Sequence, residues 1–440
     1  MLIRFAVENY SSFKERQVFT MAAGKQTRHP DHYAVVNGKR LLKGSFFFGA
    51  NAAGKSNFIK AVDFVRRMVL FGTRTMRYFD RRFLIDPACK EKPGVFQVDL
   101  MENQAVYSYG FAVEYATHKI NGEWLYRIDS AGGEQCIFER DETGHVETDI
   151  FERGRASTRF KIYCEDLKES DLLLHEMGNK NLRNAPEFED FVNVYQWFKR
   201  VVIVYPDSHP RNRSDFFLRP TADTQSLVDM LHAFDTGIEN IKKGRQPLEE
   251  ALSFLPEQVK KNILDDVAQS KADKLGEGDH CVIEIEEHQF ELSFEGEDCF
   301  AEKIMLDHGN SDALFELSDE SDGTRRLFDL IPLYDLGKKG RIIFVDELDR
   351  SLHTKLTEKF INCFFERMKG KNSQMICTTH DTNIMDLKLL RQDEIWFVER
   401  EEDHSTRIYS LNDYKQRFDK NVLNDYLIGR YGAIPCFKDE

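Results

Sequence analysis

The chain has 440 residues, of which 41% are hydrophobic and 12% aromatic, so it is long enough for two domains and can bury a large core. Its 61 basic and 75 acidic residues give a formal net charge of −14, which excludes a protein that coats itself in nucleic acid over its whole surface. Apolar runs are far shorter than the roughly 20 residues of a membrane span. The eight cysteines are scattered without a C-x-x-C pair, so we expect a cytoplasmic protein.

The first segment with a specific chemical meaning is residues 49–56, which fit the phosphate-binding pattern G-x-x-x-x-G-K-[ST]. The apolar run 45–48 predicts a short strand before it, and apolar residues at helical spacing over 58–69 predict a helix after it. A chance match in a glycine-containing turn is the alternative, but this context favours a P-loop. Lys55 would reach the β- and γ-phosphates, and Ser56 would bind Mg²⁺. The predicted contacts to the nucleotide are Gly49, Asn51, Gly54, Lys55, Ser56 and Asn57.

The composition along the chain predicts three parts. Residues 1–165 combine the P-loop with alternating apolar and polar stretches, which are typical of antiparallel strands. Residues 166–275 are charged and helical in pattern, and we expect them to form an arm inserted into the nucleotide-binding head. In residues 276–440 the strand pattern returns at 281–285 and 290–294, and this part is expected to complete the head.

Residues 317–324, Leu-Ser-Asp-Glu-Ser-Asp-Gly-Thr, lead directly into an apolar helical stretch. Ser321 and Gly323 would lie at the N-terminus of this helix, where a hydroxyl and backbone N–H groups can contact a γ-phosphate. An ordinary helix N-cap explains Ser321 equally well. The position of the segment shortly before an acidic strand end favours the nucleotide-binding interpretation.

A strand that ends in two acidic residues supplies the other half of the predicted ATPase site. Residues 342–345 are four large apolar residues, and Asp346 and Glu347 follow them. Asp346 would hold Mg²⁺, and Glu347 is placed to accept a proton from the attacking water. The alternative is a buried strand that happens to end in carboxylates. Because a P-loop precedes it, we favour the catalytic interpretation.

The next predicted strand is 375–379, and His380 follows it directly. This histidine suits a switch residue that contacts the γ-phosphate, although a lone histidine at a strand end is often only a satisfied polar residue. We therefore predict Glu347 and His380 as catalytic residues. The long separation between Lys55 and Asp346 is typical of ATPase heads of the SMC class, which carry an insertion between these two motifs.

With these segments in place, the chain resembles the ABC/SMC-type ATPases of bacterial phage-defence and abortive-infection operons, the RloA and AbiL-like group. The similar segments, spread over nearly the whole length, are residues 1–14, 320–324, 346–353, 378–381 and 426–435. The resemblance implies an α/β fold, with a P-loop ATPase head of mixed sheets and an inserted, mainly helical arm. It also implies ATP hydrolysis with Mg²⁺ as cofactor.

The resemblance further implies partners for the chain. Two heads would face each other head to tail, so that Ser321 and Gly323 contact the ATP bound by the other copy. An effector protein, typically a TOPRIM-like or HNH nuclease, would respond to the nucleotide state. Residues 321–323 read Ser-Asp-Gly where transporter ABC proteins carry Ser-Gly-Gly. Gln97 is the candidate for the Q-loop glutamine at the nucleotide, and an alternating β-strand explains it equally well.

A DNA-end or DNA-repair ATPase that binds nucleic acid directly is the alternative function. Clusters of arginine would then line a path for nucleic acid between two heads, but solvated faces also explain them. The clusters are Arg74, Arg77, Arg81 and Arg82, then Arg153, Arg155 and Arg159, then Arg211, Arg213 and Arg219.

Overall fold

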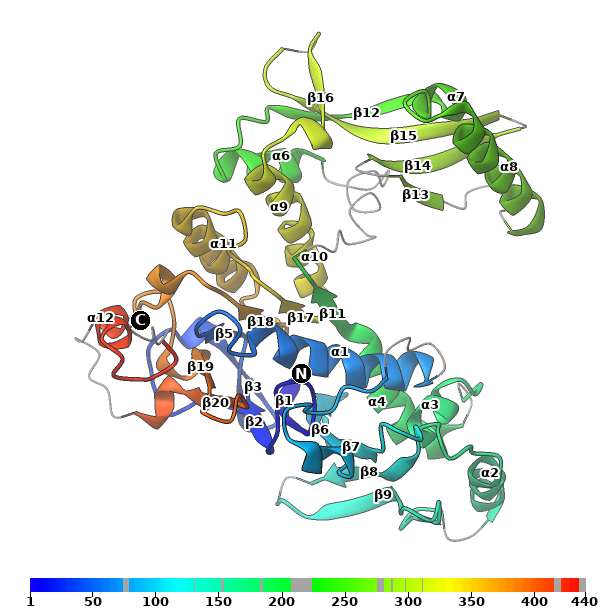
Figure 1. The fold of residues 1–440 in the computed structure, drawn as a ribbon, viewed down its shortest axis with the longest axis vertical. Coiled ribbons are helices and arrows are strands. Elements are labelled where there is room, and N and C mark those ends of the chain that lie inside the picture. Colours follow the sequence, from blue (N-terminus) through cyan, green and yellow to red (C-terminus); the bar gives the residue numbers. More distant parts are fainter. Residues whose placement is uncertain are drawn as a thin grey trace. The chain divides into compact units, whose positions relative to one another are not determined.

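The computed structural model divides into two compact units (Figure 1). The first contains Met1–Pro206, Leu336–Asp349 and Thr357–Glu440, and the second contains Asp207–Asp335 and Arg350–Leu356. The structure describes residues 1–73, 79–129, 131–151, 154–182, 185–206, 224–274, 281–285, 288–296, 298–310, 312–414 and 421–434.

A six-stranded sheet in the first unit positions the predicted site. The first five strands run parallel, and the last is antiparallel to its neighbour. The three that precede the predicted motifs are mostly apolar and fully buried, as expected for parallel strands covered on both faces. In spatial order the strands are β11 (Val201–Val204), β17 (Ile342–Val345), β18 (Gln374–Thr378), β5 (Gly44–Phe48), β19 (Ile395–Arg400) and β20 (Thr406–Ser410).

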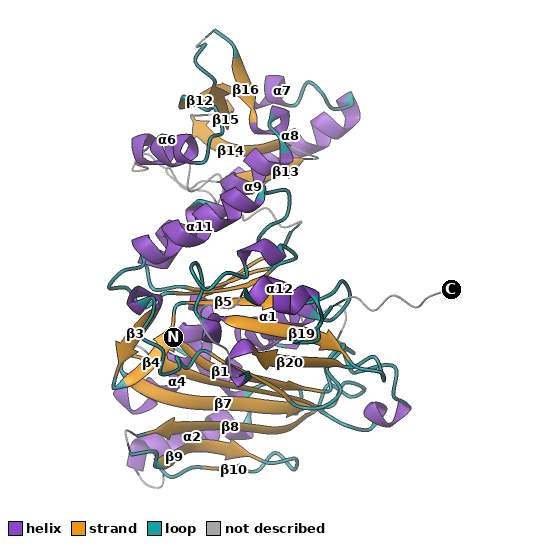
Figure 2. Ribbon diagram, turned by 90° about the vertical axis from the view of Figure 1, so that its left-hand side faces the viewer, coloured by secondary structure: helices purple, strands orange, loops and turns teal. Residues whose placement is uncertain are grey.

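Helix α1 (Lys55–Phe71) packs between this sheet and a second, seven-stranded antiparallel sheet (Figure 1). The fully buried ring of Phe58 lies 4.5 Å from that of Phe47 in β5 and 5.6 Å from that of Phe5 in the antiparallel sheet, measured between ring centroids. One aromatic core therefore joins the helix after the P-loop to both sheets. The antiparallel strands, in spatial order, are β10 (Val146–Glu147), β9 (Glu134–Arg140), β8 (Ile120–Ile128), β7 (Ala105–Val113), β6 (Gly94–Glu102), β1 (Leu2–Glu8) and β2 (Gln17–Thr20). Figure 2 shows β7, β8, β9 and β10 side by side.

The predicted arm boundary at residue 166 differs from the division that the contacts give, which begins the second unit at residue 207. Trp197 and Phe198 are buried in the core of the first unit, and β11 joins the parallel sheet directly after their helix. Strongly apolar faces on the helices before β11 explain this placement. The remaining elements of the first unit are β3 (Tyr33–Val36), β4 (Lys39–Leu42), α2 (Gly154–Glu165), α3 (Leu173–Gly178), α4 (Glu189–Arg200) and α12 (Val422–Leu427).

The second unit combines helices with an antiparallel sheet of its own, and its small core includes Leu252, Phe290 and Leu292. The strands predicted at 281–285 and 290–294 are two of the five strands of this sheet, so the second unit extends beyond residue 275, where the sequence placed the end of a mainly helical arm. Its elements are α6 (Thr224–Ala233), β12 (Asn240–Pro247), α7 (Leu248–Ala251), α8 (Glu257–Lys274), β13 (Cys281–Ile285), β14 (His288–Glu295), β15 (Asp298–Asp307), β16 (Leu314–Glu316) and α9 (Asp322–Leu330). Two further helices, α10 (Pro332–Lys338) and α11 (Thr354–Arg367), run across the boundaries between the units. Within the described residues, no helix is both long and apolar enough to cross a membrane.

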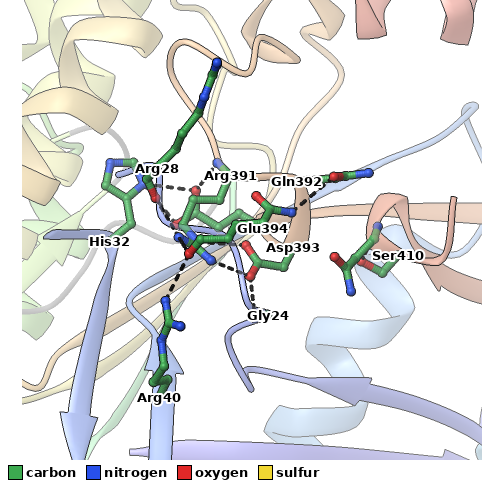
Figure 3. Close-up of polar contacts among 11 residues, drawn as sticks. Gly24, Arg28, His32, Arg40, Arg391, Gln392, Asp393, Glu394 and Ser410 are labelled. Carbon is green, nitrogen blue, oxygen red and sulfur yellow. Dashed lines mark hydrogen bonds and ion pairs between the residues drawn. The ribbon is translucent and has the colours of Figure 1, made fainter. Parts of the chain in front are cut away.

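Hydrogen bonds in a buried polar cluster connect residues 24–32 to residues 391–394, which form the turn before β19 (Figure 3). The guanidinium of Arg391 is 0% exposed and forms two 2.8 Å hydrogen bonds to the carboxylate of Asp393, which also accepts from the Gly24 N–H at 2.6 Å. Both carboxyl oxygens of Glu394 lie 3.0 Å from His32 Nδ1. Burial raises the pKa of Glu394 well above its usual value and lowers that of His32 to about 3.

Candidate active site

The P-loop connects β5 to α1, and its two glycines allow close backbone packing. A Cβ atom on Gly49 would lie 2.2 Å from the carbonyl oxygen of Val398, and one on Gly54 would lie 2.2 Å from Thr406 Oγ1. Gly54 also has a φ of +110°, which residues with a side chain rarely adopt. The glycines of the sequence pattern therefore stand where the fold leaves no space for a side chain.

Lys55 begins α1, and its ammonium group folds back onto the loop. Nζ donates to the carbonyl oxygens of Gly49 at 2.7 Å and Ala50 at 3.0 Å. Lys55 is only 5% exposed, and this burial lowers its pKa to about 8, while the carboxylates that follow β17 act in the opposite direction. A buried cation whose hydrogen-bond acceptors are two neutral carbonyls would bind anionic phosphate oxygens more strongly. The loop therefore fits a triphosphate.

The oxygen atoms predicted to hold Mg²⁺ lie together at the edge of the parallel sheet. Ser56 Oγ donates to Asp346 Oδ1 at 3.0 Å, and Thr378 Oγ1 donates to the same carboxyl oxygen at 2.6 Å. Asp346 is 3% exposed, and its backbone N–H donates to the Val204 carbonyl. Hydroxyl and carboxylate oxygens are ligands that Mg²⁺ prefers, and this ion commonly takes one or two protein groups together with phosphates. The donor set therefore fits Mg²⁺ bound to a nucleotide.

Glu347 occupies a strained position next to Asp346. Its φ is +50°, in the left-handed region, and its N–H donates to Thr378 Oγ1 at 2.8 Å. Such a conformation costs about 1–3 kcal/mol and is concentrated at functional sites. His380 Nε2 lies 3.8 Å from Glu347 Oε1, and the His380 N–H donates to the carboxylate of Asp349 at 3.1 Å. The structure thus brings the two predicted catalytic side chains together.

Three residues that support the site do not stand out in the sequence. Thr378 contacts both acidic residues after β17, as described above. Thr406 Oγ1 lies 2.8 Å from the Ala53 carbonyl oxygen and 2.7 Å from Ser12 Oγ, and Asn57 Nδ2 donates to Ser12 Oγ at 2.8 Å. Ser12 and Thr406 therefore connect the P-loop to two distant parts of the chain, and the Asn57 amide contacts Ser12.

Two predicted nucleotide contacts lie apart from these hydrogen bonds. Asn51 is exposed in the turn of the P-loop. Gln97 lies within β6, where it donates to Asp99 and Ser108 at 3.0 Å and accepts from Arg16 at 2.6 Å. These contacts connect Gln97 to its own sheet, in agreement with the alternating-strand explanation that the sequence left open.

Ser321 and Gly323 lie at the N-terminus of α9 in the second unit. Ser321 is exposed, and its Oγ accepts from the Thr324 N–H at 3.1 Å, so it caps this helix. A Cβ atom on Gly323 would lie 2.9 Å from the carbonyl oxygen of Ser351, which itself has a φ of +59°. Glycine therefore allows α9 to approach the loop that contains Ser351.

The arginine clusters are in part engaged by the protein itself. Arg82 forms an ion pair with Asp80, and Arg159 lies 3.6 Å from Glu187. These contacts account for two members of the clusters without nucleic acid. The members Arg74, Arg77, Arg153, Arg211, Arg213 and Arg219 lie outside the described residues.

The fold and the site define a P-loop nucleotide-binding protein of the α/β class with mixed sheets, as the sequence predicts. Residues 45–386 match the protein family described as "AAA domain, putative AbiEii toxin, Type IV TA system". This match includes most of the chain, and the chain belongs to that family. No curated protein matches the chain in sequence.

Solved structures of SMC heads are similar at low identity. The SMC head domain from Thermotoga maritima is 12% identical with a TM-score of 0.37, covering 93% of this chain and 98% of that one. An SmcHead bound to the C-winged helix domain of ScpA is 13% identical with a TM-score of 0.38, covering 93% and 97%. An Smc head with an extended coiled coil, bound to the C-terminal domain of ScpA derived from Pyrococcus furiosus, is 13% identical with a TM-score of 0.37, covering 93% and 96%.

Proposed function

We propose that this chain binds and hydrolyses ATP with Mg²⁺ and acts as a nucleotide-gated switch. The observation that carries the proposal is the hydrogen-bonded set of Ser56, Asp346, Thr378 and Glu347 at the edge of the parallel sheet. The buried ammonium group of Lys55 and membership of a family described as an AAA domain support it.

Each side chain has a role that follows from its position. Mg²⁺, when bound, would neutralise charge on the β- and γ-phosphates. Lys55 would exchange its two carbonyl acceptors for phosphate oxygens, while Ser56 and Asp346 supply oxygen ligands. Glu347 would accept the proton of the attacking water as that water bonds to the γ-phosphorus and the bond to the bridging oxygen of ADP breaks. His380, beside Glu347, would donate a hydrogen bond to the γ-phosphate.

Release of phosphate from ATP tests this proposal directly. We expect the purified protein to release phosphate only when Mg²⁺ is present. Lys55→Ala should lose most of its affinity for ATP, because it removes the buried cation that would contact the phosphates. Equal phosphate release by the wild-type protein and Lys55→Ala would assign the activity to a contaminant and contradict the proposal.

We further propose that the complete site needs a second copy of the chain. Ser321 is exposed at the N-terminus of α9, where its hydroxyl and the first N–H groups of the helix are suited to bind an anion. In a head-to-tail dimer, Ser321 and Gly323 of one copy would contact the γ-phosphate bound to Lys55 of the other. ATP would then hold the pair together, and hydrolysis would release it.

Mixing two inactive variants tests the shared site. Lys55→Ala damages the P-loop, and Ser321→Arg damages the segment at the N-terminus of α9. Random pairing places half of all dimers in the mixed form, and each mixed dimer contains one intact site of two. The mixture should therefore recover about a quarter of the wild-type activity. No recovery on mixing, when each variant alone is folded and inactive, would show that each site is built from a single chain.

We also propose that the switch serves an abortive-infection system and controls an effector, such as a TOPRIM-like or HNH nuclease. The family description, which names an AbiEii toxin and a type IV toxin–antitoxin system, supports this role. Bacteria that express the chain with its neighbouring gene should resist phage, and Lys55→Ala should abolish the resistance. Equal plaque numbers with the two forms would contradict the role. Tight, strongly salt-dependent binding of DNA by the chain alone would instead favour a DNA-repair ATPase.

A further inference from the structure

A segment near the C-terminus touches the beginning of the P-loop. Residues 421–434 contain α12 and a turn, and the carbonyl oxygen of Ala433 in this turn accepts a hydrogen bond from the N–H of Ala50 at 3.1 Å. Ala50 follows the first glycine of the P-loop. Two stretches at opposite ends of the sequence therefore meet at the predicted nucleotide site.

The backbone of Ala433 is held in this position through both its carbonyl oxygen and its N–H. Tyr426 Oη donates to the same carbonyl oxygen at 2.9 Å, and the N–H of Ala433 donates to Glu399 Oε1 at 3.1 Å. Glu399 Oε2 in turn accepts from Tyr409 Oη at 3.0 Å. Ala433 has a φ of +56°, so the turn keeps a backbone conformation that residues with a side chain rarely adopt. Several independent contacts thus fix the atom that meets the P-loop.

Aromatic packing anchors the segment to the sheet. The ring of Phe397 in β19 stacks on Tyr426, with centroids 5.6 Å apart and planes 7° apart, and on Tyr431 at 5.4 Å and 18°. Tyr426 is 4% exposed and Tyr431 is 1% exposed. Burying two large rings stabilises the docked segment by several times the thermal energy, because each removes a large apolar area from water.

The peptide group between Gly49 and Ala50 connects this segment to the lysine of the P-loop. Its N–H, which is that of Ala50, donates to the Ala433 carbonyl oxygen at 3.1 Å, and its carbonyl oxygen, which is that of Gly49, accepts from Lys55 Nζ at 2.7 Å. A shift of the Ala433 carbonyl would therefore move a peptide group to which the lysine is hydrogen-bonded.

We infer that residues 421–434 are a positioning element of the nucleotide site, a latch that fixes the P-loop in the form that binds ATP. This inference rests on the proposed binding of ATP by the P-loop. It assigns no chemical step to the latch. By thermodynamic linkage, a latch that favours nucleotide binding must itself be held more tightly when nucleotide is bound.

Gly432→Ala displaces the latch with a single methyl group. A Cβ atom at this position would lie 2.6 Å from Glu399 Oε1 and 2.8 Å from Tyr409 Oη, at a φ of +68°. Tyr426→Phe is the milder variant, because it keeps the stacked ring and removes only the hydroxyl that donates to Ala433. Leu427→Ala is the matched control, since Leu427 belongs to the same segment but is 58% exposed.

Affinity for a fluorescent ATP analogue is measured first, together with thermal unfolding of each variant. We expect Gly432→Ala to weaken binding at least tenfold and Tyr426→Phe about threefold, with Leu427→Ala unchanged. Wild-type affinity in both latch variants, with both folded, would overturn the inference and leave ATP binding intact. Failure of the wild-type protein to bind the analogue would instead overturn the proposed function, and the inference with it.

Hydrogen exchange separates a latch from a segment that only adds stability. Exchange of backbone amides in residues 421–434 should slow when ATP is added to the wild-type protein and should not respond in Lys55→Ala. If ATP leaves exchange in this segment unchanged while the wild-type protein binds it, the segment is a purely structural support and the inference is wrong.

Discussion

Replacing Thr378 by valine tests how the two acidic residues after β17 are positioned. The Thr378 side chain is 0% exposed, donates to Asp346 Oδ1 at 2.6 Å and accepts from the Glu347 N–H at 2.8 Å. Valine has almost the same shape but no hydroxyl, so Thr378→Val removes both hydrogen bonds with little change in packing. The backbone of Glu347, already at a φ of +50°, loses one of the contacts that hold it there.

The expected loss follows from these two bonds. A hydrogen bond to a carboxylate contributes about 1.5 kcal/mol or more, and leaving a buried N–H without an acceptor costs about 1 kcal/mol or more. If both energetic costs apply fully in the transition state, the barrier to hydrolysis rises by about 2.5 kcal/mol, which corresponds to roughly a seventyfold slower hydrolysis. Thr378→Ser is the matched control, because it keeps the hydroxyl and loses only a methyl group.

The assay is the steady-state rate of phosphate release at saturating Mg·ATP, with unfolding temperatures measured in parallel. We expect Thr378→Ser to remain within about threefold of the wild-type protein and Thr378→Val to fall far below it. Hydrolysis by a folded Thr378→Val at close to the wild-type rate would show that the hydroxyl has no part in placing Glu347.

Three further predictions follow from the same structure. Gly54→Ala should abolish nucleotide binding in a direct titration, because its Cβ would lie 2.2 Å from Thr406 Oγ1; retained affinity would contradict this packing. ATP affinity should fall up to tenfold per pH unit above pH 8, since only protonated Lys55, with a pKa of about 8, binds phosphate well. An equally steep fall in Lys55→Arg would show that another group causes the pH dependence. Buried Glu394 keeps a proton that the unfolded chain has lost above pH 4.5, so its contribution to stability is lost as pH rises. Between pH 4.5 and 6.5 the unfolded chain protonates His32, whose folded pKa is about 3, and this offsets the effect. The His32 effect is also present in Glu394→Gln, so relative to that variant the unfolding free energy should fall by up to about 1.4 kcal/mol per pH unit as pH rises above 4.5, and parallel curves from chemical denaturation would contradict the assignment.

Short-range patterns in the sequence predict that the P-loop lies beside the acidic strand end, as it does in the structure. The P-loop and the acidic strand end each specify a strand followed by polar residues, and parallel strands bring their carboxyl ends to one edge. That rule is enough to place Ser56 beside Asp346, although the two are far apart in the chain. The hydrogen bond between them has the partners that the two motifs predict.

The supporting residues could not be predicted in the same way. Thr378 has a weak signal, because it lies at the end of an apolar strand two residues before His380. Ser12 and Thr406 have none, since threonine and serine in a turn or an edge strand are common and their contact depends on the tertiary fold. The hydrogen bond between Ala50 and Ala433 joins backbone groups, so no pattern of side chains in the sequence predicts it.

The sequence pattern also did not show where the inserted unit begins. Helical periodicity in residues 166–206 shows an apolar face but does not show which surface covers it. In the structure that face packs into the first unit, and the four-residue strand β11 after it is too short to distinguish from the end of a helix by periodicity alone. Gln97 lies in a strand, as the alternating pattern around it predicts, and its contact with a nucleotide remains a prediction.

A single-turnover comparison of the wild-type protein with Glu347→Gln tests whether Glu347 removes a proton from the water that attacks ATP. Both proteins should bind Mg·ATP with similar affinity, because the substitution keeps the size of the side chain. We expect hydrolysis to be at least about a hundredfold slower in Glu347→Gln, the effect expected for loss of a general base. Hydrolysis at the wild-type rate by a Glu347→Gln protein that binds ATP normally would contradict it.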